Sequence, residues 1–435
     1  MADASEVGTR LPQEESVTAW LQRLLPRTRH VHWVLADQIL VSGCNFLLAI
    51  IYARALGPAG FGLYALITVA QQYFVSIGVS LVANPLVTRA PHVDDGEEKV
   101  RLIAGSLSAQ FLLSLALALL AAAGLSLYLA NGAVGISGLA VIGLAASSFA
   151  LPLLEWCRKL CFLGRDGPTL ISIDALTYLP ILIAAFFLAQ SGLLTLDLGV
   201  LLWGAATVPV AVRAALRLRM HCGFAAARSF LIENWRLARD FIVPFQAQWL
   251  GSQGMVYLAV PMVGAAGIGA YRSISGLLGF TNAIGATLDN MMPIRFAEVY
   301  RSGGTAALRG YAVRFAAVLI GPPALLLLPL VFFAEPIVRL LLGDAFSAYA
   351  EILWAQALYV FVLYASRVAN YHERARLRTK RIAVAALLGT VVSTVLVIVM
   401  ASEFGAIGLV WSTVLGALSS LVYLAFGMID DIRRG

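Results

Sequence analysis

The stretch Gly57-Pro-Ala-Gly-Phe-Gly-Leu-Tyr64 follows the first long apolar segment, and Gly264-Ala-Ala-Gly-Ile-Gly-Ala-Tyr271 repeats its pattern 207 positions later. This offset is nearly half of the 435 residues, so the chain is predicted to contain two copies of one unit. Duplicated halves are typical of membrane transporters, in which two similar bundles rock about a shared central site. Further residues pair at an offset of 208: Gln38 with Gln246, Asn45 with Gln253, Pro85 with Pro293, and Trp203 with Trp411.

The composition predicts an integral membrane protein. Apolar residues make up 60% of the chain, charged residues 13%, and the mean hydropathy is +0.84. A helix needs about 20 apolar residues to cross the hydrocarbon core, and helices are required because no water there satisfies exposed backbone groups. Twelve segments meet this condition: 33–54, 61–84, 102–130, 135–157, 169–190, 195–217, 240–262, 267–291, 312–334, 347–370, 381–401 and 405–428.

The expected fold is therefore all-α, with two six-helix bundles related by a pseudo-twofold axis along the membrane normal. The bundles are predicted over 33–217 and 240–428, with a basic cytoplasmic linker at 218–239 and tails at 1–32 and 429–435. In the first tail, Val17, Trp20, Leu21 and Leu24 share one helical face, which predicts a helix lying on the inner leaflet. The alternative for residues 1–15 is a disordered polar tail.

The basic residues predict the orientation. Of 31 Lys and Arg, 28 fall in the termini or the even-numbered connections. Arg54 and Arg339 stand at helix ends, and Arg272 is the one arginine assigned to the interior of a span. Because cytoplasmic loops carry the excess of basic residues, both termini are expected on the cytoplasmic side. The predicted location is the cytoplasmic (inner) membrane of a bacterium. The net charge of +7 then reflects topology and does not suggest nucleic acid.

The sequence offers little that would support catalysis. The outward connections are short, and no inner loop carries the Gly-x4-Gly-Lys-Ser/Thr pattern of a phosphate-binding loop. The four cysteines form no disulfide framework, and Cys157 with Cys161 at i, i+4 has too few neighbouring ligands for a metal site. We therefore expect no enzyme activity, no metal and no cofactor.

Polar side chains form a stripe on each of two equivalent helices. The first span carries Gln38, Ser42, Asn45 and Tyr52 on one face, and the seventh repeats this face with Gln246, Gln253 and Tyr257. Both stripes are expected to line one hydrated cavity and to contact substrate there. The alternative is hydrogen bonding between helices.

Arg272 is the sharpest candidate for substrate binding. It lies inside the eighth span, where an uncompensated cation costs roughly 2.5–3.5 kcal/mol on insertion scales. It should therefore face an acidic partner or an anionic ligand, and its planar fork suits a diphosphate. A structural salt bridge is the alternative. Arg54, at the outer end of the first span, is a second candidate, although it could simply reach the interface.

Three carboxylates are candidates for binding a coupling ion. Asp174 lies within the fifth span, whereas Asp37 and Asp289 lie near the inner ends of the first and eighth spans. Each could bind an ion or pair with a cavity arginine. For Asp37 and Asp289 the alternative is an interfacial location.

The run Ala53-Arg54-Ala-Leu-Gly57-Pro-Ala-Gly-Phe61-Gly62-Leu-Tyr64 resembles the start of Wzx-type polysaccharide flippases. These belong to the multidrug/oligosaccharidyl-lipid/polysaccharide (MOP) exporter superfamily. Gly267-Ile-Gly-Ala-Tyr271-Arg272 and Gly405-Ala-Ile-Gly408 are similar to segments of its second half.

The resemblance implies a V-shaped pair of bundles around a cationic cavity that opens alternately to either side. It implies transport of polyprenyl-diphosphate-linked oligosaccharide for O-antigen, capsule or exopolysaccharide assembly, with membrane lipids, a polysaccharide polymerase and other assembly proteins as partners. The family's cavity cations correspond to Arg272 and, less closely, to Arg54. Lipid II flippases of this superfamily carry more charge in the early spans, so we expect the chain to lie outside that subgroup. The rival is a drug or organic-cation antiporter of the same architecture, and a scaffold subunit of the polysaccharide machinery is a third hypothesis.

Overall fold

The computed structural model describes residues 29–94, 96–131, 136–217, 223–249 and 253–434. Within these ranges every regular element is helical and no strand occurs. Nine helical segments of the described residues are long and apolar enough to cross a membrane, and one of them, His32–His92, runs through two predicted spans. The inner-leaflet helix predicted around residues 17–24 lies outside the described residues.

The first half begins with one long bent helix. Helix α2 (Arg29–Gly78) contains the first predicted span and most of the second, and it continues into a π-helical turn, η1 (Val79–Ala83). The short helices α3 (Asn84–Arg89) and η2 (Ala90–His92) follow. Four further long helices complete this half: α4 (Glu97–Ala130), α5 (Gly138–Gly164), α6 (Gly167–Gln190) and α7 (Leu196–Arg217).

The second half repeats this plan with more interruptions. The linker predicted at 218–239 is helical from Phe224 onward, as part of α8 (Phe224–Trp249). The predicted span 267–291 is divided between α9 and α10, which are separated at Leu278 and Gly279. The elements are α9 (Met255–Leu277), α10 (Phe280–Phe332), α11 (Ala334–Leu342), η4 (Asp344–Tyr349), α12 (Glu351–Ala375), α13 (Thr379–Phe404) and α14 (Ala406–Arg434).

The duplicated glycine motif makes the same bend in both halves. Gly57 in α2 and Gly264 in α9 each have φ 66° and ψ 178°. This region of backbone conformation is accessible essentially to glycine alone, because a Cβ would be strained there. The motif therefore specifies a sharp turn between two successive helices, once in each half.

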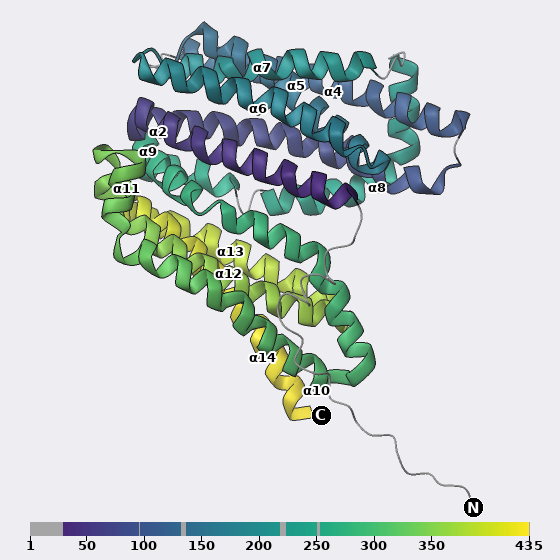
Figure 1. Cartoon of the computed structure of the whole chain (residues 1–435), viewed down its shortest axis with the longest axis vertical. Helices are drawn as coiled ribbons and strands as arrows, with labels where there is room; N and C mark the ends of the chain where they lie inside the picture. Colours follow the sequence, from purple (N-terminus) through teal and green to yellow (C-terminus); the bar gives the residue numbers. More distant parts are fainter. Residues whose placement is uncertain (1–28, 95, 132–135, 218–222, 250–252, 435) are drawn as a thin grey trace, which may run out of the picture.

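The two bundles meet at one end and diverge toward the other (Figure 1). They approach each other where α2, α9 and α11 lie together, and they separate toward the end that holds the start of α2 and the C-terminus. The main contact between the halves is that of α2 with α9. This arrangement is the V-shaped pair of bundles that the resemblance predicts.

Two equivalent glycines allow the backbones of the two halves to approach closely. A Cβ placed on Gly62 of α2 would lie 1.8 Å from the carbonyl oxygen of Ala265. A Cβ placed on Gly269 of α9 would lie 1.9 Å from the carbonyl oxygen of Pro58. Since each glycine lies against the backbone of the other half, the contact follows the pseudo-twofold relation between the halves.

Candidate functional site

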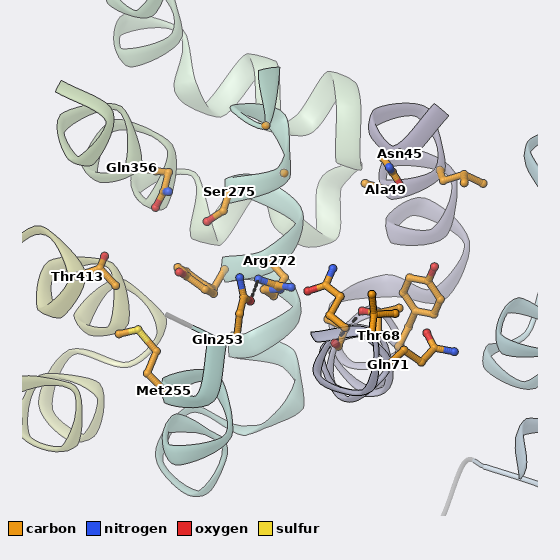
Figure 2. A pocket seen from close by; sticks show the side chains of 18 of the residues that line it. Asn45, Ala49, Thr68, Gln71, Gln253, Met255, Arg272, Ser275, Gln356 and Thr413 are labelled. Carbon is orange, nitrogen blue, oxygen red and sulfur yellow. Dashed lines mark hydrogen bonds between the residues drawn. The ribbon is translucent and has the colours of Figure 1, made fainter. Parts of the chain in front are cut away.

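A cavity of about 830 Å³ lies between the two bundles. Helices α2, α5, α6 and α7 form its first wall, and α9, α12, α13 and α14 form most of the second. Amides and hydroxyls are frequent in the lining, together with the aromatic side chains of Tyr64, Tyr178, Trp203, Tyr271 and Tyr359. Figure 2 shows several polar members of this lining: Asn45, Thr68, Gln71, Gln253, Arg272, Ser275, Gln356 and Thr413.

Arg272 is the cation of the second wall. It stands on α9 beyond the bend at Gly264, and its side chain is half-buried. Its Nη1 donates a hydrogen bond of 2.9 Å to Oε1 of Gln253 (Figure 2). Among the described residues it makes no ion pair with a carboxylate, so the structural salt bridge considered above is not found there. The guanidinium therefore keeps most of its donors for other partners.

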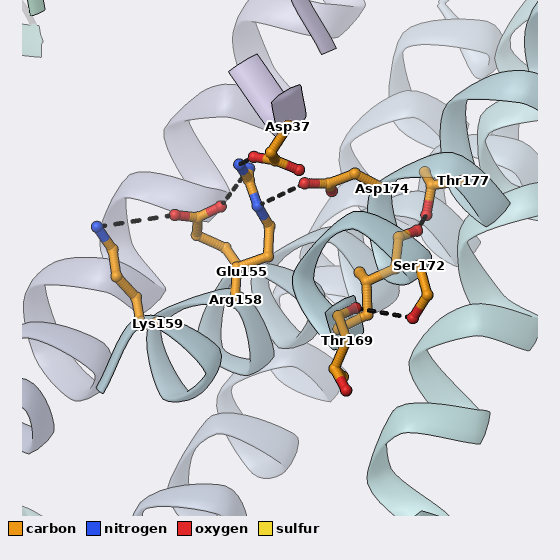
Figure 3. Close-up of polar contacts among 9 residues, drawn as sticks. Asp37, Glu155, Arg158, Lys159, Thr169, Ser172, Asp174 and Thr177 are labelled. Carbon is orange, nitrogen blue, oxygen red and sulfur yellow. Dashed lines mark hydrogen bonds and ion pairs between the residues drawn. The ribbon is translucent and has the colours of Figure 1, made fainter. Parts of the chain in front are cut away.

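Arg158 is the cation of the first wall, and it is surrounded by acids (Figure 3). It lies on α5 and makes ion pairs with Asp37 at 3.3 Å, Glu155 at 3.1 Å and Asp174 at 3.1 Å. The side chains of Asp37 and Asp174 are 0% and 4% exposed, so burial strengthens their attraction to Arg158. Lys159 approaches Glu155 at 3.9 Å. Three carboxylates thus share one close arginine and one more distant lysine.

The structure brings only part of the predicted set to the cavity. Asn45, Gln253, Arg272 and Asp174 line it. Asp37 does not line the cavity, but it forms an ion pair with Arg158, which does. Four other candidates do not line it: Gln38, Gln246, Arg54 and Asp289.

The polar stripes divide between the two interpretations given above. Asn45 and Gln253 face the cavity, whereas Tyr52 and Tyr257 of the same stripes make hydrogen bonds between helices. Tyr52 donates to the carbonyl oxygen of Gly199 at 3.0 Å, and Tyr257 donates to that of Leu66 at 2.6 Å.

Arg54 contacts the other half of the molecule at the closed end of the V. Its Nε donates to the carbonyl oxygen of Leu341 at 2.9 Å, and its Nη2 donates to that of Leu340. Both carbonyls lie in the last turn of α11, where helix carbonyls lack intrahelical partners and the dipole favours a cation. Arg54 is therefore a contact between the halves in this structure.

Asp289 belongs to a separate polar group in the second half. One carboxylate oxygen accepts a 2.6 Å hydrogen bond from the hydroxyl of Tyr371, and the other forms an ion pair with Arg367. The Asp289 side chain is 44% exposed.

The sequence interpretation missed Arg158, which it placed just beyond the predicted span 135–157, and it did not single out Glu155 within that span. Among the described residues the cavity is lined by two arginines, Arg158 and Arg272, whereas the sequence interpretation placed only Arg272 within a span. A signal was present: Arg158 and Arg367 lie 209 positions apart, on the fourth helix of each half. The duplication could have identified both as equivalent helical positions.

Comparison with known proteins supports the architecture. No protein-family model and no curated protein sequence matches the chain. Among solved structures, the lipid II flippase MurJ in an inward closed conformation is similar with a TM-score of 0.71 and 15% identity, over 91% of this chain and 87% of that one. An inward-facing multidrug resistance MATE transporter of the MOP superfamily is similar with a TM-score of 0.63 and 14% identity, over 94% and 96%.

A third structure is a MOP superfamily transporter from Pyrococcus furiosus, described as having a binding pocket of reverse polarity. It is similar with a TM-score of 0.54 and 12% identity, over 93% of this chain and 98% of that one. At these identities the likeness concerns the fold. The chain has the fold of the MOP exporter superfamily.

Proposed function

We propose that this protein is a flippase that moves polyprenyl-diphosphate-linked oligosaccharide across the cytoplasmic membrane by alternating access, for surface polysaccharide assembly. The observation that carries the proposal is the contrast between the two cavity arginines. Arg158 is surrounded by three carboxylates, whereas Arg272 has, among the described residues, only the neutral amide of Gln253 as a side-chain hydrogen-bond partner. Arg272 therefore gives the second wall a positive charge that no described carboxylate balances.

A diphosphate is the ligand that best fits this charge. An uncompensated cation at membrane depth costs several kcal/mol, and an anionic headgroup beside Arg272 would offset that cost. The guanidinium can donate two parallel hydrogen bonds to phosphate oxygens, which a lysine ammonium cannot do. Arg272 is therefore proposed to hold the diphosphate, with Gln253 orienting its side chain.

The remaining lining suits a sugar chain. Amides such as Asn45 and Gln356 and hydroxyls such as Thr413 both donate and accept hydrogen bonds, as sugar hydroxyls do. The rings of Trp203 and Tyr178 offer flat apolar surfaces with a polar edge, against which a sugar ring can stack. Gln38, Gln246 and Arg54 lie away from this lining, so we do not retain them as substrate ligands.

The proposed direction is outward. On the orientation inferred from the basic residues, the open end of the V faces the cytoplasm, where the lipid-linked substrate would enter. With the cell interior negative, outward movement of an anion is favoured by about 2.3 kcal/mol per charge per 100 mV. The membrane potential can therefore supply a driving force, and a cation travelling with the substrate would reduce it.

A coupling ion, if one is used, is proposed to bind at Asp174 and Asp37. These two acids and Glu155 give three negative charges against Arg158 and the more distant Lys159. One proton or small cation would balance the group. Asp289 is the weaker candidate, because Arg367 and Tyr371 already occupy both of its oxygens.

The same acidic group favours the second candidate function, an organic-cation antiporter. A cationic drug would be drawn to Glu155 and Asp174, which line the cavity, and it would be repelled by Arg272. The two functions therefore assign opposite roles to the two walls.

Substitution of Arg272 distinguishes the flippase from the antiporter. Arg272→Ala is expected to abolish surface polysaccharide display at unchanged membrane abundance, and Arg272→Lys to restore it partly. The matched control is Arg339→Ala, which removes an exposed cation outside the cavity. In a deletion strain, the lipid-linked repeat unit should accumulate in the cytoplasmic leaflet. Normal surface glycan in the Arg272→Ala strain would refute the role of Arg272, and new sensitivity to cationic dyes in the deletion strain would favour the antiporter.

A further inference from the structure

A second cavity, of about 500 Å³, lies within the first half of the molecule. It is formed where α4 and α6 begin and α5 and α7 end, so that four helix termini surround it. It shares no lining residue with the central cavity. On α5 and α6 the two cavities use different faces: Arg158 and Asp174 line the central cavity, whereas Cys157 and Ile173 line the second.

The lining of the second cavity is apolar at depth and basic at the rim. Cys157, Ile173 and Val210 are buried members of the surrounding apolar core. At the rim, Arg213 and Arg217 are exposed on one face of α7, four residues apart, and Lys99 at the start of α4 lines the same space. The one acid of the lining, Asp166, caps the N-terminus of α6 and accepts a hydrogen bond from the Thr169 amide at 3.1 Å.

We propose that this cavity binds one anionic phospholipid of the cytoplasmic leaflet. The headgroup phosphate would lie between Arg213, Arg217 and Lys99, and an acyl chain would enter the apolar interior. Basic pockets between membrane helices on the cytoplasmic side are suited to anionic headgroups, and the volume lies within the range of about 300–1,000 Å³ typical of small-molecule sites. Neither Arg213 nor Arg217 makes an ion pair with a described residue, so their charges complement a phosphate.

The separation of the two cavities argues for a resident lipid instead of the transported one. A substrate held in the second cavity would face away from Arg272 and from the contact between the halves. The site is therefore independent of the proposed function, and its occupant would stabilise the first half as one unit.

Cys161 provides a direct reporter, because its half-buried thiol lines the second cavity. The full-length protein with Cys161 as its single cysteine is placed in nanodiscs of phosphatidylcholine, with increasing amounts of phosphatidylglycerol. The rate of alkylation by a maleimide is then measured. We expect phosphatidylglycerol to slow the alkylation of Cys161.

The double variant Arg213→Gln/Arg217→Gln should need about thirtyfold more phosphatidylglycerol for the same protection, because each basic residue contributes about 1 kcal/mol near an anionic headgroup. The matched control, Arg228→Gln/Arg236→Gln, removes two exposed arginines of α8 that lie outside the cavity and should behave like the parent. Native mass spectrometry of the same proteins should show one retained phosphatidylglycerol in parent and control only. Equal protection by both lipids, protection unaffected by the Arg213/Arg217 exchange, or protection by a soluble prenyl diphosphate alone would overturn the proposal.

Discussion

Replacing Gly62 with alanine is expected to weaken the contact that holds the two halves together at their closed end. The added Cβ would stand 1.8 Å from the carbonyl oxygen of Ala265 and 2.6 Å from its carbonyl carbon. A carbon and a carbonyl oxygen normally approach to about 3.3 Å, so the shortfall is roughly 1.5 Å. Both atoms that would be displaced belong to backbone, and α2 and α9 must therefore move apart.

Overpacking of this kind typically costs about 1–3 kcal/mol. In the proposed alternating-access cycle this contact is lost when this end opens, so the cost falls on the closed conformation. An energy of this size changes a conformational equilibrium about 5- to 150-fold. Gly62→Ala should therefore shift the population toward the conformation that is open at the opposite side of the membrane.

The shift can be measured through a thiol in the central cavity. Ser275→Cys, in a background without the native cysteines, places a reporter in the lining. Its rate of alkylation by a membrane-impermeant maleimide is followed from the outside of intact cells and from inside-out vesicles. On the orientation proposed above, Gly62→Ala should raise the outside rate and lower the inside rate. The control is Gly43→Ala on the same helix, where an added Cβ meets no atom within 4 Å. Identical rates for the two alanine variants would show that the glycine contact does not control opening.

Two further substitutions test polar contacts of α2 and α5. Arg54→Ala removes the hydrogen bonds from α2 to the last turn of α11. A contribution of about 1 kcal/mol from this exposed contact predicts a roughly fivefold rise in outside labelling of the same reporter. An unchanged rate would mean that this contact does not hold the halves together. Arg158→Gln leaves Asp37 and Asp174 buried without their closest cation, which typically costs about 3–5 kcal/mol, so the melting temperature should fall. Adding Asp174→Asn should restore part of the loss, and a double variant no more stable than the single one would contradict the ion-pair account.

The sequence by itself determined the membrane location, the helical architecture and the duplication. Each of these depends on local properties: segment length and hydropathy decide whether a helix can cross the bilayer. The bends at Gly57 and Gly264 are also local, since only glycine accepts their backbone conformation. For this reason two short motifs sufficed to predict the repeat on which the fold is built.

Only the tertiary structure decided which polar groups meet. Arg158 pairs with Asp37 across 121 positions of the chain, and Arg54 reaches the carbonyl of Leu341 across 287. A polar residue within an apolar span has the same local sequence whether it faces a cavity, a neighbouring helix or a buried ion pair. The rotation and packing of whole helices choose among these outcomes, because each buried polar group must find a partner within reach. That packing places Arg272 beside the neutral amide of Gln253, and the second wall of the cavity is therefore positively charged.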